Sequence, residues 1–273
     1  DANTEELSVR IAAVEAALTA LVTETENYEK FWRTFSRYIK EGVVTSWEHK
    51  DALGKLLRFE STFTEPGKLT SFEDYVSRMK ENQKDIYVLY GASRSQLENS
   101  PYLDALRARG FEVGFFTEGG DQFVVESLMK FGEKEIKSID RAGLDLPPLE
   151  AQPDQPGLDE QEAEGLTTWV SDTFKDRFSK VTTSDRVTSA PAIALQGEGD
   201  ISPEIKAYLR AMGQEIPETH PEIAFNPHNP IVMKLAELRS KDEDLATLLA
   251  DQLINTALLR AGMLADTAKW ADN

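Results

Sequence analysis

Cysteine is absent from this sequence, and its absence excludes several kinds of chemistry at once. Disulfide bonds, thiolate metal sites and cysteine nucleophiles all need that side chain. A chain without cysteine fits a reducing compartment, so we expect a cytoplasmic protein. Histidine is scarce too, and His49, His220 and His228 lack the spacing of metal ligands. We therefore expect no catalytic and no metal-binding residues.

Long apolar runs and glycine-rich loops are also missing. No apolar stretch approaches the roughly 20 residues that span a bilayer. The opening residues, DANTEELSVR, have neither the basic nor the apolar region of a secretion signal, and they lack Met, which predicts a fragment of a longer protein. Gly110 and Gly119–Gly120 form neither a GxGxxG turn nor a phosphate-binding loop. We expect no membrane partner and no cofactor bound to this chain.

Positive charge is in short supply. The chain has 30 Lys and Arg against 48 Asp and Glu, a net charge of −18. Nucleic-acid binding depends on clustered Lys and Arg that contact phosphates. We therefore expect no nucleic-acid partner.

The length of 273 residues predicts roughly two domains. The clearest boundary is Ala142–Gly165, which has four prolines and many acids but no Lys or Arg. Such a segment buries too little apolar surface to offset its ordering entropy. The sequence predicts a first domain over 1–141, an acidic Pro-rich linker over 142–165 and a second domain over 166–273. The alternative is a long surface loop within one domain.

The first domain reads as a helical segment followed by a small α/β unit. Ser71 is a predicted helix cap, and apolar residues at helical spacing follow it. Strands then alternate with helices, which favours an α/β/α layer with parallel strands. The predicted helices are 5–24, 27–40, 47–59, one starting at Ser71, 93–98, 100–110 and 121–131, and the predicted strands are 86–90, 111–116 and 135–139.

The second domain reads as a mixed α+β domain. Its first helix carries Trp169, Val170, Phe174 and Phe178. The remaining predicted strands are 181–187, 192–195 and 222–225, and the remaining predicted helices are 202–212, 230–238 and 243–263. The fold class of the whole chain is therefore α+β with an α/β part.

One stretch is unusual as a string: Thr70–Tyr87 reads TSFEDYVSRMKENQKDIY. It resembles the middle domain of the heat-shock-protein-90 chaperone family, in particular its bacterial members, where a DYVSRMKE run is close to a signature. Further segments along the chain also resemble the family and occur in the same order as in its members: Asn27–Trp32, Leu56–Ser61, Asn99–Leu106, Ser184–Ile193 and Asn226–Val232.

The resemblance implies a molecular chaperone of the stress response that binds unfolded or partly folded client proteins and forms a homodimer. By this likeness, 1–141 is the later part of the middle domain, and 166–273 is most of the C-terminal dimerisation domain with its last helix truncated. The family's ATP-binding domain has no counterpart here. The resemblance therefore implies a parent ATPase that uses ATP and Mg, with the ATP site outside this chain, and no enzyme activity in the fragment.

An apolar stripe marks the predicted helix Ser202–Met212. Ile205, Tyr208, Leu209 and Met212 fall at i, i+3, i+4 and i+7. Burying such side chains is worth about 1.5–3 kcal/mol each, so the stripe is either core or an interaction surface. The resemblance favours client binding, which predicts that Tyr208 and Met212 are more than a third exposed.

Phe123 is a second client-binding candidate, because the family carries an aromatic residue near a client-contact surface at the matching position. The alternative is an ordinary aromatic residue at a helix start, packed on the sheet.

The predicted helix Glu243–Met263 is apolar nearly all round and needs burial on several sides. These sides can be buried either by the rest of its own domain or by a second copy related by a twofold axis. The resemblance favours a dimer interface formed by Leu245, Leu248, Leu249, Leu253 and Leu258.

Two other functions stay open from the residues alone. One is an assembly scaffold that only dimerises. The other is a nucleotide-using α/β enzyme, which the missing glycine-rich turn disfavours.

Overall fold

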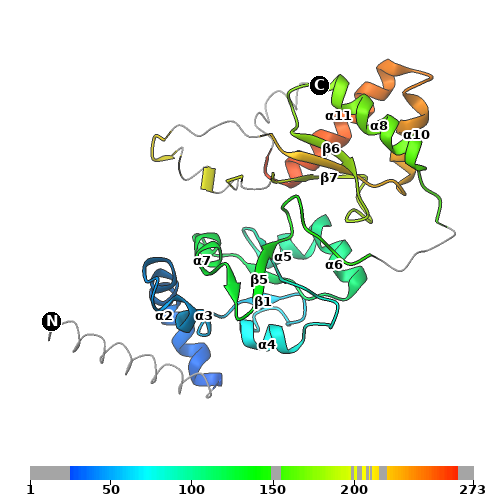
Figure 1. Ribbon diagram of the computed structural model, residues 1–273. Helices are drawn as coiled ribbons and strands as arrows, with labels where there is room; N and C mark the ends of the chain where they lie inside the picture. Colours follow the sequence, from blue (N-terminus) through cyan, green and yellow to red (C-terminus); the bar gives the residue numbers. More distant parts are fainter. Residues whose placement is uncertain are drawn as a thin grey trace. The chain divides into compact units, whose positions relative to one another are not determined.

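A computed structural model gives the fold of the chain (Figure 1). It describes residues 25–148, 155–197, 200–201, 205–206, 209, 211–214 and 220–263. The chain divides into two compact units. The first comprises the described residues up to Glu98 together with Phe111–Ser138, and the second comprises Asn99–Gly110 and the described residues from Ile139 onward. The domain limits predicted from the sequence, 1–141 and 166–273 with a linker over 142–165, stay a prediction.

The first unit contains a five-stranded mixed sheet in the order β1-β3-β2-β5-β4. Its central strand β2 pairs in parallel with both β3 and β5, and β1 and β4 pair antiparallel at the edges. The strands are β1 (Glu60–Ser61), β2 (Ile86–Tyr90), β3 (Gly114–Phe116), β4 (Lys130–Phe131) and β5 (Lys134–Ser138). The run IYVLY of β2 is almost wholly buried, as expected of a strand with parallel neighbours on both sides.

Among the described residues of this unit, five helices accompany the sheet: α2 (Thr25–Thr45), α3 (Lys50–Gly54), α4 (Phe72–Ser77), α5 (Arg94–Glu98) and α7 (Asp121–Leu128). Helices α2, α3 and α7 lie side by side (Figure 1). One core joins helices to sheet, with Trp32 of α2, Phe72 of α4, Leu128 of α7 and Val88 of β2 all buried in it. The predicted cap is confirmed, because the Ser71 side chain accepts a hydrogen bond from the Asp74 backbone N–H.

The second unit has a three-stranded sheet in the order β6-β8-β7, parallel between β6 and β8 and antiparallel between β7 and β8. The strands are β6 (Lys180–Thr183), β7 (Ala192–Leu195) and β8 (Glu222–Phe225). The helices are α8 (Glu160–Thr173), α10 (Pro230–Leu238) and α11 (Glu243–Arg260). Their apolar faces meet the sheet in a second core that contains Val170, Phe225, Leu235 and Ile254.

The short helical segment of the second unit consists of the 3-10 turn η1 (Pro101–Leu103) and helix α6 (Asp104–Arg109). Gly110 ends α6 with φ of 65°, a left-handed conformation that glycine adopts without steric cost. The hydroxyl of Tyr102 donates to the carbonyl oxygen of Ala194 in β7. This hydrogen bond joins the segment to the sheet of its own unit.

Several predicted boundaries are wrong. Helix α7 ends at Leu128, and Lys130–Phe131 forms a strand, because Gly132 (φ 60°) turns the chain into the β4–β5 hairpin. Helix α3 is a single short turn rather than a helix over 47–59, and α8 begins at Glu160, inside the predicted linker, where Asp159 and Glu162 form a capping box. Smaller differences affect α2, β3, β6 and α11, and the predicted helix 5–24 lies outside the described residues.

The fold has α+β character, as predicted, and the predicted parallel pairing in the first unit is confirmed. The α/β/α layer order stays a prediction.

Candidate interaction surfaces

The side chains of the apolar stripe in 202–212 differ in their exposure to solvent. Ile205 is buried, Leu209 is half-buried and Met212 is 60% exposed, while Tyr208 lies outside the described residues. The backbone N–H of Gln214 donates to the Leu209 carbonyl oxygen across Gly213 (φ 76°), the geometry of a helix that ends there. Met212 therefore stands at the end of a helix turn with most of its surface in solvent. Its exposure exceeds the predicted third, and the client-binding role of the stripe stays a prediction.

Phe123 lies in the first turn of α7 and is 39% exposed. Its neighbours Gln122 and Val124 are buried, so the helix turns only part of this end toward solvent. Lys40 of α2 fixes the same end, since its Nζ lies 2.8 Å from Glu118 and 2.6 Å from Asp121. Phe123 thus lies at a helix start that two ion pairs connect to α2, and its client-binding role stays a prediction.

Helix α11 has one buried and one exposed face. Ala246, Ala250, Ile254 and Ala257, three or four residues apart, are buried in the core of their own unit. On the opposite side Leu245 is exposed and Leu248 is 65% exposed. We call the surface around Leu245 and Leu248 the outer face of α11.

The other leucines predicted at a dimer interface differ from this pair. Leu249 and Leu253 are partly buried against the core of the second unit. Leu258 is buried within it, so that side chain has little surface to offer to a second copy. All five leucines lie on one helix, but of these five only Leu245 and Leu248 are exposed to solvent. The dimer role of the set stays a prediction.

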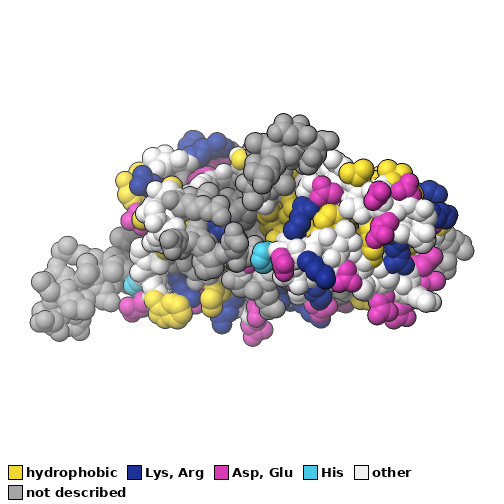
Figure 2. Space-filling model, turned by 90° about the horizontal axis from the view of Figure 1, so that it is seen from above, with side chains coloured by type: hydrophobic (Ala, Val, Ile, Leu, Met, Phe, Trp, Pro, Cys, Tyr) yellow, Lys and Arg dark blue, Asp and Glu magenta, His cyan; other side chains and the backbone are white. Residues whose placement is uncertain are grey.

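Hydrophobic side chains elsewhere reach the surface in small groups. Figure 2 shows them on one face of the molecule, interspersed with acidic and basic side chains. Soluble proteins commonly expose single apolar residues, so only contiguous groups indicate a binding surface.

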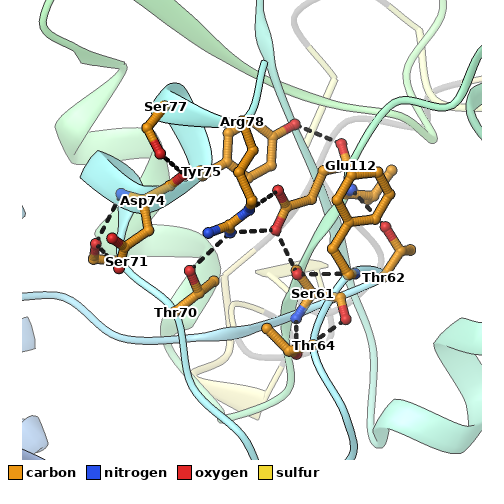
Figure 3. Close-up of polar contacts among 12 residues, drawn as sticks. Ser61, Thr62, Thr64, Thr70, Ser71, Asp74, Tyr75, Ser77, Arg78 and Glu112 are labelled. Atoms are coloured by element: carbon orange, nitrogen blue, oxygen red, sulfur yellow. Dashed lines mark hydrogen bonds and ion pairs between the residues drawn. The ribbon is translucent and has the colours of Figure 1, made fainter. Parts of the chain in front are cut away.

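The stretch that carries the family signature surrounds a buried polar cluster in the first unit (Figure 3). The Glu112 carboxylate is buried and accepts hydrogen bonds from Arg78 Nε and Nη2 at 3.0 and 2.8 Å and from Ser61 Oγ at 2.6 Å. Arg78 Nη2 also donates to Thr70 Oγ1 at 2.9 Å. The hydrogen bond to Glu112 raises the pKa of the Arg78 guanidinium. These hydrogen bonds tie the end of α4 to the residues that lead into β3.

The Tyr75 hydroxyl is the second centre of this cluster. It donates to the Glu112 carbonyl oxygen at 2.5 Å and accepts from Gln83 Nε2 and the Tyr87 backbone N–H, both at 3.0 Å. Burial raises the pKa of Tyr75 above its ordinary value. We call Ser61, Thr70, Tyr75, Arg78, Gln83 and Glu112 the Glu112 cluster.

No role of Glu112 was predicted from the sequence. A signal was present, since a glutamate between Phe111 and Val113 in an apolar run is rarely buried without a partner. The partner, Arg78, lies 34 residues earlier, and nothing in the sequence identifies it.

Among the residues that the structure describes, no group of three or more His, Cys, Asp or Glu side chains is arranged to hold a metal ion. In the same residues no helix is both long enough and apolar enough to cross a bilayer. His220 and His228 are exposed and His49 is half-buried.

A comparison with a family model and comparisons with individual known proteins agree with one another. The family model "Hsp90 protein" matches residues 12–273. The chain is 34% identical over 254 residues to the "Chaperone protein HtpG" of Desulfotalea psychrophila, with 90% of this chain and 41% of that protein covered. It is 36% identical over 251 residues to the HtpG of Shewanella halifaxensis and 34% identical over 253 residues to that of Geobacter sulfurreducens, with 90% of this chain and 39% of each relative covered. The chain thus spans about two fifths of the length of these relatives.

Proposed function

The chain belongs to the Hsp90 family, and from this membership we propose that it is the client-contact and dimerisation part of an HtpG-like molecular chaperone. The observation that carries the proposal is the match to HtpG relatives over 90% of the chain. In this proposal clients are unfolded or partly folded proteins, the parent is a cytoplasmic ATP-dependent homodimer, and ATP with Mg binds outside this chain.

Two features of the structure support the placement of the working surfaces. Met212 is exposed at a helix end beside the half-buried Leu209, which suits contact with clients of variable shape because methionine adapts to many surfaces. Leu245 and Leu248 expose apolar surface on α11, which suits a self-complementary interface between two copies. The two surfaces predict separable activities.

An aggregation assay tests the client surface. We expect the chain to slow the aggregation of a denatured substrate protein and Met212→Glu to weaken this effect several-fold. Met129→Glu is the matched control, because Met129 is exposed to the same degree but lies in the first unit. Equal effects of the two substitutions would contradict the placement of the client site, and ATP turnover by this chain would contradict the placement of the ATP site.

The second candidate is a scaffold that only dimerises, favoured by the outward-facing Leu245 and Leu248. Firm dimerisation together with no effect on aggregation would favour this function over the chaperone.

A further inference from the structure

The segment Asp140–Ala142 lies beside the end of β7 in the second unit. The Gln196 backbone N–H, one residue after β7, donates to the Asp140 carbonyl oxygen at 3.0 Å, and the Ala142 N–H donates to the Gln196 carbonyl oxygen at 2.7 Å. These bonds form a parallel bridge between Arg141 and Gln196. The backbone of Arg141 is therefore fixed by the sheet of its own unit.

Asp200 binds both the guanidinium group of Arg141 and the ammonium group of Lys206. Its carbonyl oxygen accepts a hydrogen bond from Arg141 Nη1 at 3.0 Å, and its carboxylate lies 3.0 Å from Lys206 Nζ. The Asp200 and Lys206 side chains are only 10% and 16% exposed. Because little water reaches them, each of the two charges is stabilised mainly by the other. We call Arg141, Asp200 and Lys206 the Asp200 network.

The Asp200 network holds the start of the helical residues that lead to Met212. Ile205 and Lys206 are both helical, and the first is buried while the second is paired with Asp200. Leu209 lies about one turn further along and is half-buried, and Met212 follows another turn later with 60% of its surface in solvent. The exposed methionine is therefore held in place from the N-terminal side of its helix.

We propose that the Asp200–Lys206 ion pair positions the turn that carries Leu209 and Met212 for client contact. Asp200 and Lys206 are then positioning residues that do not touch the client themselves. The inference rests on the proposed function and adds a determinant of client affinity that lies outside the apolar surface. A turn held in one conformation loses less conformational entropy when a client binds than a turn that must first be ordered. The ion pair should therefore raise the affinity for clients.

A site-directed spin label measures this positioning without a client. The chain has no cysteine, so a single introduced cysteine carries the only label. One label is placed on Ala211→Cys, an exposed position beside Met212, and in a second protein on Ser240→Cys, an exposed position elsewhere in the same unit. We expect Asp200→Asn to increase the mobility of the first label and to leave the second unchanged, because asparagine keeps the size of the side chain and removes the charge that pairs with Lys206.

The aggregation assay measures the consequence for clients. We expect Asp200→Asn and Lys206→Gln each to raise the protein concentration that halves aggregation by about fivefold, the cost of ordering one or two side chains on binding. The double variant should be no weaker than either single variant, because both substitutions remove the same ion pair. The matched controls are Glu237→Gln and Lys234→Gln, which break an exposed ion pair in the same unit with the same changes in charge and should have no effect.

Several results would overturn the proposal. Unchanged mobility at Ala211→Cys, or an equal increase at Ser240→Cys, would show that the ion pair does not position this turn. Higher mobility at Ala211→Cys with unchanged suppression of aggregation would show that the positioning does not serve clients. An equal loss of suppression in Glu237→Gln would assign the effect to net charge.

Failure of the proposed function gives a different result. The unchanged protein would then not slow aggregation at all, and the part of the inference that concerns clients would fall with it. The mobility of the label on Ala211→Cys would still decide whether the ion pair positions the turn.

Discussion

The Glu112 cluster consists of polar side chains that pair with one another inside the protein, whereas the outer face of α11 consists of apolar side chains exposed to solvent. In the cluster, Tyr75, Arg78 and Glu112 contact one another inside a single unit. On α11, Leu245 and Leu248 face solvent without a covering group among the described residues. The most recognisable stretch of the sequence therefore lies around buried polar contacts. The surfaces open to partners consist of common apolar residues with no rare string of their own.

This difference has an energetic reason. Buried polar groups are costly when unpaired, so each member of the Glu112 cluster restricts the identity of the others. An exposed leucine needs only to be apolar, so many residues satisfy its position. Substitutions in the cluster should therefore lower stability, and substitutions on the outer face of α11 should lower association.

The largest effect is expected for Tyr75→Phe. Removing the hydroxyl takes away one hydrogen bond each from the Glu112 carbonyl oxygen, Gln83 Nε2 and the Tyr87 N–H, which costs about 3 kcal/mol of the free energy of unfolding. Urea unfolding measures the change. Tyr38→Phe on the exposed end of α2 is the control and should stay within about 0.5 kcal/mol. A loss below about 1 kcal/mol for Tyr75→Phe would show that the cluster is not a stabilising network.

Arg78→Ala should follow, with a loss of about 2–3 kcal/mol. The buried Glu112 carboxylate would lose its cation, and the partial exposure of Arg78 keeps the loss below that of a fully buried pair. The same urea titration, with exposed Arg37→Ala as the control, measures it. If Glu112→Gln restores the stability of the Arg78→Ala protein, the unpaired charge is the cause.

An alkaline pH titration tests the buried tyrosine hydroxyls. Burial raises the pKa of Tyr28 to about 12 from its ordinary value of 10.0. The folded-state pKa is the higher one, so this contribution to stability is complete below pH 10 and is lost as the pH rises through 12, by about 2–3 kcal/mol in total. Chemical unfolding from pH 9 to 12 should show the decline. Tyr28→Phe should reduce the slope, with the rest due to Tyr75 and Tyr102, whose pKa values burial also raises.

The smallest change in stability is expected for Leu248→Ser. Since Leu248 is 65% exposed, the free energy of unfolding should change by less than about 0.5 kcal/mol. Self-association measured by sedimentation should weaken by about tenfold, the equivalent of about 1.4 kcal/mol. Phe63→Ser, at an exposed site of the first unit, is the control. Unchanged association in the Leu248→Ser protein would remove α11 from the dimer interface.

Sequence patterns were most reliable where one local rule decides the structure. The strands Ile86–Tyr90, Ala192–Leu195 and Glu222–Phe225 and the helix Pro230–Leu238 lie where the sequence predicted them, because each is an apolar run bounded by strong turn or cap residues. The predictions failed at Lys130–Phe131, where a two-residue strand depends on pairing with β5, and at Glu160, where a local capping box outweighed the acidic composition.

The amino-acid sequence by itself determined the family, the cap at Ser71, the end of α6 at Gly110 and the periodic apolar faces, because these follow from residue identity and spacing along the chain. Only the tertiary structure decided which side chains are available to a partner. It buried Leu258 and left Leu248 in solvent on the same helix, paired Arg78 with a glutamate 34 residues away, and joined Arg141 to the carbonyl oxygen of Asp200. The physical reason is that exposure and charge pairing depend on which distant segments pack together, and spacing along one helix does not contain that information.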